Sequence, residues 1–575
     1  MENTWTKSAQ APEDFFTANK DYPAILCQLF WNRGLRTKEQ IEKFLNPTLA
    51  ELLLPETMLN MSAGANRIIQ AIKNNERMAI FGDYDTDGIC SSVILAQFFN
   101  RINFDNFDVF IPNRFKSGYG LTTDKIKEIA EDGVKIIISV DCGITDVEEV
   151  ELAKSLGLEV LIFDHHQPHL ILPKTLIIDP NQSDDSYPFK FLVATAIAYK
   201  LVQLLARLMQ FPYIGSLERQ FLPLVAIATV ADVAPLLDEN RILVKFGLEG
   251  LKEISNIGLR ALMSVAGISD LKKYDSYHIG FVIAPRLNAV GRVEHTTPAG
   301  RIEDTDYSFE LLMTENENEA KVWAQKIHDF NIERQKQVEQ ILNDVNKEIE
   351  KQDGLERVIF CGSPNWSRGM IGVVAGRLKD KWHRPVLLYS QGETTSLGSA
   401  RSIPGYNLVE VMDRGKELFL ESGGHKEAAG FEFVNANLEK LHQFLKEQGD
   451  LLLREENLLP SLEIETTIEP EEITSEFLNW WHKFEPFGRG NVNPILEMKN
   501  VAVDNLKTVG VSGRHLKFSV KKNGKVFNVI SFNNAEKLSF LKPGMMIDMV
   551  FNLKENEWQG RTYLDLELLD VKKIN

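Results

Sequence analysis

Four short apolar runs in the first third of the chain constrain its fold more than any other feature. They cover residues 78–81, 135–140, 160–163 and 175–178, and longer amphipathic segments separate them. Runs this short fit buried strands better than buried helices. Alternation with amphipathic segments is typical of a parallel sheet covered by helices, so we predict an α/β fold. Ligands of such sheets lie beyond the carboxyl ends of the strands, and chemistry is expected there.

Three closely spaced carboxylates follow the first run. The segment AIFGDYDTDG, residues 79–88, contains Asp83, Asp85 and Asp87. Carboxylates this close repel one another unless a cation or bound protons neutralise them. The pattern also matches the opening of an EF-hand loop, but Ile94 stands at the twelfth position, where that loop needs a glutamate. A solvated acidic turn is the alternative if this motif is taken alone.

The same edge of the predicted sheet is acidic again after two further runs. Asp141 follows the second run, and Asp164, His165 and His166 follow the third. Asp232 lies in the segment VAIATVADVAPL. Its apolar neighbours suggest a buried charge, which would cost several kcal/mol, roughly, unless it is paired or metal-bound. Helix capping could explain Asp141 or Asp232 singly, but so many acids at one sheet edge favour a metal site.

The ligand types indicate the metal and the reaction. Mixed carboxylate and imidazole ligands suit Mn²⁺, whereas Ca²⁺ prefers oxygen throughout and Mg²⁺ keeps more water. The number of acids leaves room for two ions, which can generate a hydroxide nucleophile and clamp the attacking and leaving oxygens of a phosphoryl group. We therefore predict phosphodiester hydrolysis with Mn²⁺ (or Mg²⁺), in a site for two ions.

The length of 575 residues exceeds what one hydrophobic core usually serves, so several domains are expected. We predict five segments: an N-terminal extension (1–50), a parallel-sheet catalytic domain (51–303), a long linking helix (304–351), a second α/β domain (352–455) and a small β-barrel (456–575). The formal charge is 64 − 81 = −17, so any nucleic-acid binding must be local. No secretory signal or membrane span is apparent, and a cytoplasmic protein with no membrane partner is expected.

Ordered motifs along the chain resemble those of the DHH phosphoesterases. The four motifs of the predicted catalytic domain are DYDTDG (83–88), VDCG (140–143), DHH (164–166) and ADV (231–233). The second α/β domain resembles the DHHA1 accessory domain, with SARS (399–402) and GGH (423–425). Two further motifs, PRLNAVGR (285–292) and FEPFGRGN (484–491), extend the resemblance to the RecJ-like branch along nearly the whole chain, and the terminal barrel then resembles an OB fold.

The resemblance implies roles for individual residues. The implied metal ligands are Asp85, Asp87, Asp141, His165 and Asp232, with Asp141 bridging two ions. The implied catalytic groups, which would orient ligands or contact the scissile phosphate, are Asp83, Asp164 and His166. The implied substrate-binding residues are Arg114, Arg286, Ser399, Arg401, Gly423, Gly424 and His425.

The implied activity is a single-stranded-DNA exonuclease that acts from 5′ to 3′, releases mononucleotides and serves DNA repair and recombination. A monomer that works with a helicase and a single-strand-binding protein is expected. Two positions depart from related patterns. Phe81 replaces the histidine of the pyrophosphatase branch, which disfavours a small pyrophosphate substrate, and Ser367 stands where RecJ-like chains usually have a histidine. A phosphodiesterase for short oligonucleotides or cyclic dinucleotides and an inactive replication scaffold remain the alternatives.

Overall fold

The computed structural model describes residues 3–112, 120–211, 214–292, 306–351, 354–510, 513–558 and 561–574. The chain forms two compact units: residues 49–458, and residues 1–48 together with 459–575. None of the helices in these described ranges is long and apolar enough to cross a membrane.

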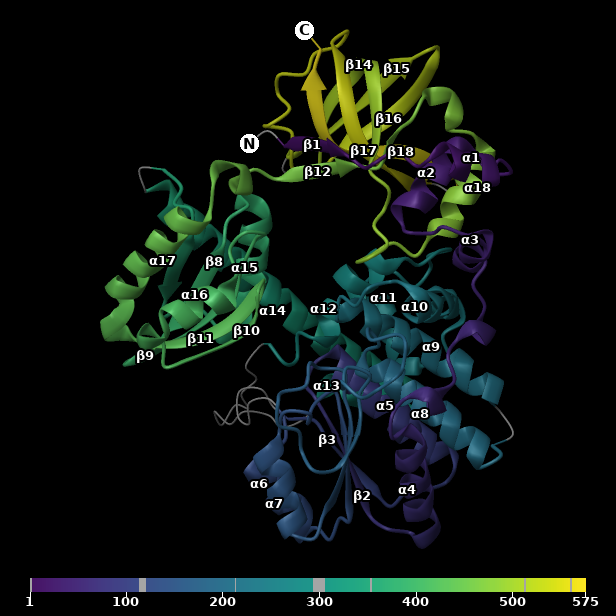
Figure 1. Ribbon diagram of the computed structural model, residues 1–575, viewed down its shortest axis with the longest axis vertical. Helices are drawn as coiled ribbons and strands as arrows, with labels where there is room; N and C mark the ends of the chain where they lie inside the picture. Colours follow the sequence, from purple (N-terminus) through teal and green to yellow (C-terminus); the bar gives the residue numbers. More distant parts are fainter. Residues whose placement is uncertain are drawn as a thin grey trace. The chain divides into compact units, whose positions relative to one another are not determined.

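A five-stranded parallel sheet forms the centre of the first domain (Figure 1). In sheet order its strands are β3 (Phe107–Phe110), β2 (Met78–Gly82), β4 (Ile136–Val140), β5 (Glu159–Phe163) and β6 (Leu176–Ile178). The four predicted strands are confirmed. The edge strand β3 was not among them, because an edge strand is only half-buried and its sequence FDVF lacks a continuous apolar run.

Helices cover both faces of this sheet (Figure 1). Strand residues such as Ile80 and Ile138 pack with α4 (Met61–Asn74), α5 (Thr86–Arg101) and α8 (Ala194–Leu208). The alternating residues Phe81 and Ile137 pack with α6 (Thr123–Glu131) and α7 (Val147–Ser155). The predicted α/β fold class is therefore confirmed, and burial on both faces explains why the strands are apolar throughout.

A helical region follows the sheet. It comprises α9 (Ile214–Ala231), α10 (Asp238–Gly250), α11 (Ile257–Val265), the π-helix η4 (His278–Ile283), α12 (Ala284–Leu287), α13 (Tyr307–Met313) and α14 (Glu317–Glu350). The stretch predicted as one linking helix, 304–351, thus contains two helices, and its first two residues lie outside the described ranges. Helix α14 starts anew because the Asn316 side chain accepts hydrogen bonds from the backbone N–H groups of Asn318 and Glu319.

The second α/β domain is built on a mixed sheet in the order β10-β11-β9-β8-β7. The strands are β7 (Ile359–Ser363), β8 (Val386–Gln391), β9 (Thr395–Arg401), β10 (Glu421–His425) and β11 (Ala428–Val434). One face packs on α14 and α15 (Arg368–Trp382), and the other packs on α16 (Leu408–Arg414) and α17 (Leu438–Leu452). Short 3-10 turns occur at Leu49–Glu51, Pro55–Thr57, Leu251–Glu253, Lys416–Leu418, Asn435–Asn437, Glu455–Leu458 and Pro470–Glu472.

The other unit contains the predicted barrel. Strands β14 (Leu496–Val509), β15 (His515–Lys522), β16 (Lys525–Ser531), β18 (Arg561–Lys573) and β17 (Met546–Trp558) are paired in that order. Pairing of β14 with β17 closes the ring, so these strands leave no open edge. The short β13 (Thr466–Thr467) adds to β14 from outside the ring.

The N-terminal segment is part of this barrel unit. Strand β1 (Thr4–Lys7) pairs in parallel with β12 (Ser461–Ile464), as Figure 1 shows. Helices α1 (Glu13–Ala18), α2 (Ala24–Asn32) and α3 (Lys38–Leu45) share a core with α18 (Ser475–Phe484) and the barrel. The rings of Phe30 and Phe484 stack with centroids 5.3 Å apart, and Arg33 forms a 2.7 Å ion pair with Glu465. The segments predicted as a separate N-terminal extension (1–50) and barrel (456–575) thus fold together as one unit.

Candidate active site

Three aspartates meet at the carboxyl edge of the parallel sheet. Gly82, Val140 and Phe163 are paired in register at the ends of β2, β4 and β5. The next residue after each strand is Asp83, Asp141 and Asp164, and these side chains are 4%, 2% and 1% exposed. The sheet therefore holds three buried carboxylates side by side.

The loop after β2 adds two carboxylates, which are fixed by helix starts. Asp85 caps α5, because its Oδ1 accepts hydrogen bonds from the backbone N–H groups of Asp87 at 2.8 Å and Gly88 at 3.3 Å. The Asp87 carboxylate accepts from the backbone N–H groups of Ala194 and Thr195, both at 2.8 Å, at the start of α8. These contacts hold both carboxylates in place without neutralising them.

Gly88 permits this close arrangement. A Cβ atom at Gly88 would lie 2.4 Å from the backbone nitrogen of Asp83, a distance that no side chain tolerates. The glycine of the DYDTDG motif thus lets α5 begin directly against the end of β2.

Asp141 lies at the centre of the acidic edge. Its backbone is left-handed with φ at 64°, a conformation that costs about 1–3 kcal/mol for a non-glycine residue and is typical of functional sites. Its Oδ1 lies 3.2 Å from His165 Nε2. Burial, followed by the charges of Asp87 and Asp85, raises the pKa of Asp141 well above its ordinary value. The protein alone therefore does not balance the charge at this position.

Asp164 and His166 form a tight pair beside it. His166 Nδ1 lies 2.7 Å from Asp164 Oδ1, and the backbone N–H of Ile144 donates to Asp164 Oδ2 at 3.1 Å. Burial disfavours the charged forms, but the bond between the two side chains outweighs it. The pKa of Asp164 is lowered to about 2 and the pKa of His166 is raised to about 9. Asp164 thus fixes the orientation of the His166 ring.

Asp232 reaches the site from the end of α9 and not from the sheet. Its side chain is exposed, so the expectation that its apolar neighbours bury it is wrong. The flanking apolar residues belong to the last turn of a helix whose end opens toward solvent. Desolvation by nearby groups, with the charges of Asp87 and Asp85, still raises the pKa of Asp232 to about 6.

Two groups of side chains among the described residues have the geometry to hold a metal ion. One is Asp141, His165 and His166, and the other is Asp83, Asp85 and Asp141; within each group the ligand atoms lie within 4.8 Å of one another. Asp141 belongs to both. Asp83 and His166 belong to these ligand groups, although the resemblance implies that they are catalytic groups and not metal ligands. Asp87 is in neither group, but its Oδ2 lies 3.5 Å from His165 Nε2.

Asp179 is a further acid at this edge that the sequence analysis missed. It directly follows β6, is fully buried, and its Oδ2 makes no hydrogen bond in the described part of the chain. Burial and the charge of Asp164 raise the pKa of Asp179 to about 8, although the backbone N–H of Asn181 donates to its Oδ1. The rule applied to the other strands, an acid directly after an apolar run, would have found it.

The PRLNAVGR segment packs against the DYDTDG loop. Asn288 Oδ1 accepts hydrogen bonds from the backbone N–H and the hydroxyl of Thr86, both at 2.8 Å. A Cβ atom at Gly291 would lie 3.1 Å from the Tyr84 ring, so these segments are in close contact. Arg286, on α12, is half-buried and donates from Nε to His328 Nδ1 at 3.2 Å.

The SARS and GGH motifs lie on β9 and β10 of the accessory sheet, on either side of β11. Ser399 of β9 is paired with Gly430 of β11, which is paired with Gly423 of β10; Arg401, Ala428 and His425 form another such row. The structure therefore brings together Ser399, Arg401, Gly423, Gly424 and His425. Ser367 begins α15 without a side-chain capping bond. Arg114 lies outside the described residues.

Helix α15 connects the accessory sheet to the PRLNAVGR segment. A Cβ atom at Gly369 would lie 2.4 Å from the backbone oxygen of Arg292. One turn later, a Cβ atom at Gly372 would lie 2.9 Å from Ser399 Oγ and 3.5 Å from Arg401 Nη2. Arg292 of the first domain and the implied substrate-binding residues Ser399 and Arg401 of the accessory domain thus lie along the first turns of one helix.

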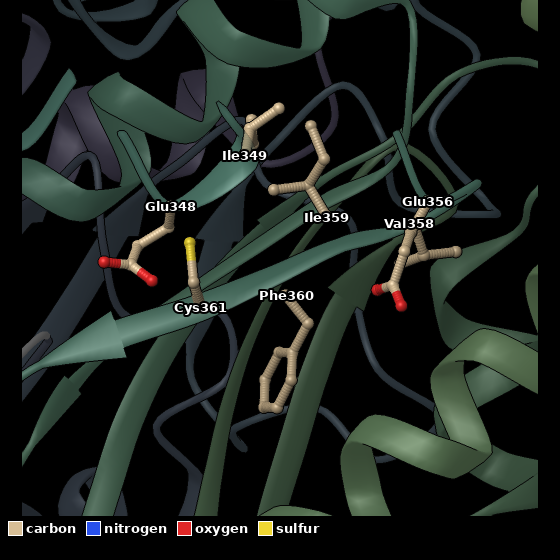
Figure 2. A pocket seen from close by; sticks show the side chains of 7 residues that line it. All are labelled: Glu348, Ile349, Glu356, Val358, Ile359, Phe360 and Cys361. Carbon is tan, nitrogen blue, oxygen red and sulfur yellow. The ribbon is translucent and has the colours of Figure 1, made fainter. Parts of the chain in front are cut away.

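A hollow on the accessory domain does not belong to this site. Figure 2 shows it between the end of α14 and strand β7, with Glu348 and Cys361 in its lining. Burial, with a smaller effect of the Glu348 charge, raises the pKa of the Cys361 thiol to about 12. The thiol is therefore not an activated nucleophile.

Comparisons with known proteins cover the whole chain. Residues 77–229 match the DHH family, N-terminal domain; residues 355–452 match the DHHA1 domain; and residues 464–570 match the RecJ OB domain. The single-stranded-DNA-specific exonuclease RecJ of Bacillus subtilis is 34% identical over 95% of this chain and 68% of its own length. The protein of the same name from Escherichia coli is 30% identical over 96% of both chains.

A solved structure agrees with these matches. The crystal structure of RecJ in complex with Mn²⁺ from Thermus thermophilus superposes with a TM-score of 0.83 at 25% identity, over 100% of this chain and 80% of that chain.

Proposed function

Since the chain belongs to the RecJ family of single-stranded-DNA-specific exonucleases, we propose that it degrades single-stranded DNA from the 5′ end and releases mononucleotides. One observation carries the assignment of chemistry to this chain. The buried Asp141 belongs to two ligand groups at the edge of the parallel sheet. An inactive scaffold would have no need to keep so many like charges buried together.

The residues present fit a pair of divalent cations. Buried carboxylates whose charges repel one another, together with two imidazoles, are the ligand set expected for Mn²⁺. We assign Asp85, Asp141 and His165 as ligands, and Asp83 and His166 are able to complete the two groups. Asp87 lies beside His165, and the charge of Asp232 interacts with those of His165, Asp87 and Asp85. When bound, the cations would supply Lewis acidity toward the phosphoryl group and acidify the attacking water.

The chain itself orients these groups before substrate arrives. Asp87 is held by the start of α8, and Asp164 fixes the ring of His166 so that Nε2 is the nitrogen directed away from that pair. His166 would then contact the scissile phosphate. This preorganisation avoids rearrangement of the protein during the reaction.

The accessory domain would hold the 5′ end. Arg401 can form paired hydrogen bonds with phosphate oxygens. Ser399 and Gly423 lie in the adjacent row of the sheet, where Gly423 leaves open space for a phosphate. Arg286 approaches from the catalytic domain, next to the segment that contacts Gly369. The accessory domain would hold the 5′ end of the strand beside metal ions that the catalytic domain binds. This placement would set the 5′ to 3′ polarity of degradation.

The barrel would bind the strand further along. Among four phenylalanines of the barrel, Phe518 and Phe551 are buried, Phe527 is half-buried, and Phe532 is 42% exposed. Phe532 is flanked by His515, with ring centroids 5.4 Å apart, and by Lys554 Nζ, 5.2 Å from its centroid. An exposed ring between basic groups suits a stacked base and its phosphate.

The test is hydrolysis of labelled single-stranded DNA with and without Mn²⁺. Asp141→Ala and His165→Ala are expected to lower kcat at least a hundredfold, because each removes an assigned ligand, while the protein stays folded. Retention of more than about a tenth of the rate, roughly 1.4 kcal/mol of barrier, would exclude that residue as a ligand. Cleavage of short oligonucleotides or cyclic dinucleotides alone would support the other DHH activities.

Strands blocked at one end test the polarity. Mononucleotide release should stop when the 5′ end is blocked and continue when the 3′ end is blocked. Arg401→Ala should raise KM and reduce any preference for a 5′-phosphate, with little change in the Mn²⁺ dependence. Degradation of 5′-blocked strands would reverse the polarity and remove the role of Arg401.

A further inference from the structure

A buried arginine on α14 takes no part in the site described so far. Arg334 is 8% exposed, and it forms no ion pair with a carboxylate of the described residues. Its hydrogen bonds from Nε, at 3.2 Å, and from Nη2, at 2.9 Å, both go to Asn331 Oδ1. A buried guanidinium normally has a carboxylate partner, and this chain has an excess of acids to supply one.

Among the described residues, the charges that act on Arg334 are those of other arginines. After burial, the groups that act on it most are Arg292, Arg377 and Arg286, and together they lower its pKa to about 10. These arginines come from three different parts of the fold: Arg286 from α12, Arg292 from the end of the PRLNAVGR segment and Arg377 from α15. The fold thus gathers four guanidinium groups that repel one another.

Hydrogen-bond donors also outnumber acceptors here. Asn331 is fully buried and gives its one oxygen to Arg334, whereas its Nδ2 has no partner in the described part of the chain. One turn before it on the same helix, His328 Nδ1 accepts from Arg286 Nε, and Arg286 Nη1 donates to the carbonyl of Val282 at 2.6 Å. A buried amide donor without a partner costs about 1–3 kcal/mol, so packing alone does not explain this cluster.

An anion with several acceptor oxygens would complete the arrangement. A phosphate group offers the negative charge that Arg334 lacks among the described residues, and an acceptor for Asn331 Nδ2. The cluster borders the proposed end-binding residues, because Gly369 contacts Arg292 and Gly372 lies against Ser399 and Arg401.

We propose that Arg334, Asn331 and Arg377 form a phosphate-binding site between α14 and α15, which holds the substrate strand at a phosphate group outside the metal centre. That the phosphate belongs to DNA rests on the proposed function, whereas the existence of the anion site does not. Both a terminal monophosphate and an internal phosphodiester have the required oxygens, and the experiment separates them.

The first experiment measures Tm of the metal-free full-length protein with and without inorganic phosphate. The variants are Arg334→Gln and Lys336→Gln, which remove one positive charge from the same helix at a buried and an exposed position. Phosphate should raise Tm of the parent protein and of Lys336→Gln. The rise in Tm of Arg334→Gln should be at most half as large. Without phosphate, Arg334→Gln should have an equal or higher Tm than the parent, because a repelled charge is removed.

A structural arginine gives the opposite pattern. If Arg334→Gln lowers Tm in phosphate-free buffer and phosphate stabilises all three proteins equally, the site is overturned. Arg334→Lys keeps the charge without the planar fork, so it should keep only part of the phosphate effect. The Tm measurements with inorganic phosphate do not involve DNA. They therefore still test the anion site if the parent protein does not cleave DNA.

The second experiment measures Kd for single-stranded oligonucleotides with a 5′-phosphate or a 5′-hydroxyl at several salt concentrations. Arg334→Gln should weaken binding at least fivefold and lower the salt slope by about 0.7, the value for one phosphate contact on a single strand. Loss with both oligonucleotides identifies an internal phosphodiester, and loss with the 5′-phosphate alone identifies the terminal group. Unchanged Kd for both would remove DNA as the ligand.

Discussion

Buried carboxylates are the dominant feature at the scale of single residues. The buried Asp141 and Asp179 have raised pKa values, because burial and neighbouring acids disfavour their charged forms. The exposed Asp232 also has a raised pKa, to which desolvation by nearby groups and the charges of Asp87 and Asp85 contribute. Asp164 is the exception, since His166 pairs with it directly. The metal-free site is therefore a source of instability that a cation relieves.

This arrangement predicts a pH dependence of stability. The pKa of Asp179 is raised from 3.8 to about 8, so the folded protein keeps a proton that the unfolded chain releases above pH 3.8. Its stabilising effect is complete below that pH and is lost as the pH rises toward 8. Asp179→Asn keeps the acceptor for Asn181 but cannot ionise. In chelator, its Tm should exceed that of the parent at alkaline pH and decline less as pH rises.

A matched control is Asp105→Asn, because Asp105 is exposed in the same unit. Its Tm should follow that of the parent protein at every pH. A parallel fall of Tm with pH in Asp179→Asn and the parent would show that Asp179 is ionised in the folded state.

Phe532 offers a second prediction for a single residue. Phe532→Ala should weaken binding of long single strands by about 1–3 kcal/mol, because one stacked base is lost. Fluorescence anisotropy at constant salt measures this directly. Val526→Ala is the control, since Val526 is 54% exposed on the same barrel but cannot stack. Equal losses in the two variants would mean that Phe532 contributes only apolar surface.

At the scale of elements, α15 holds two domains together through its glycines. Gly369 meets the backbone of Arg292, whereas Gly376 of the same helix has no atom within 4 Å of an added Cβ. Gly376→Ala should therefore raise the free energy of unfolding by about 0.5–1 kcal/mol, because alanine suits a helix better than glycine. Gly369→Ala should lower it by about 1–3 kcal/mol, because the added methyl group forces the backbones apart.

Urea denaturation of both variants measures these opposite signs. Gly369→Ala should also raise KM for single-stranded DNA, since it shifts the helix that borders Ser399 and Arg401. If both Gly369→Ala and Gly376→Ala stabilise the protein, α15 and the backbone of Arg292 are not in close contact at Gly369.

The sequence predicts those elements whose patterns are local. Strands β2, β4, β5 and β6 are recognisable because burial on both faces makes them apolar throughout, and the acids after them mark the site. The exposure of Asp232 depends on where α9 ends and what surrounds that end, which its flanking residues do not reveal. Asn331 and Arg334 look like ordinary positions of a charged helix, and only the fold brings Arg286 and Arg377 to them.

At the scale of the whole molecule, the chain divides its work between two units that do not follow the order of the sequence. The nuclease unit is continuous, whereas the barrel unit takes its first strand and three helices from the N-terminus. Removal of residues 456–575 alone would therefore leave the apolar faces of α1, α2 and α3 without their core. Point variants separate the two units more cleanly than truncations do.

We predict that Phe30→Ala unfolds the barrel unit at lower temperature. Phe30 is fully buried and stacks on Phe484, so its loss should cost about 3–5 kcal/mol. Calorimetry should show a lower transition for that unit and an unchanged one for the nuclease unit. Phe98→Ala, at a fully buried position of the nuclease unit, should have the reverse effect. A shift of both transitions in either variant would show that the units unfold together.

Joining β1 to β12 has a consequence for synthesis on the ribosome. The first 48 residues emerge early, but the segment that completes their core begins at residue 459. During this interval the continuous nuclease unit can fold domain by domain, while Phe15, Leu26 and Phe30 have no core to enter. The nascent chain therefore presents the apolar side chains of its first 48 residues to chaperones until the segment that begins at residue 459 emerges, and the barrel unit can fold only then.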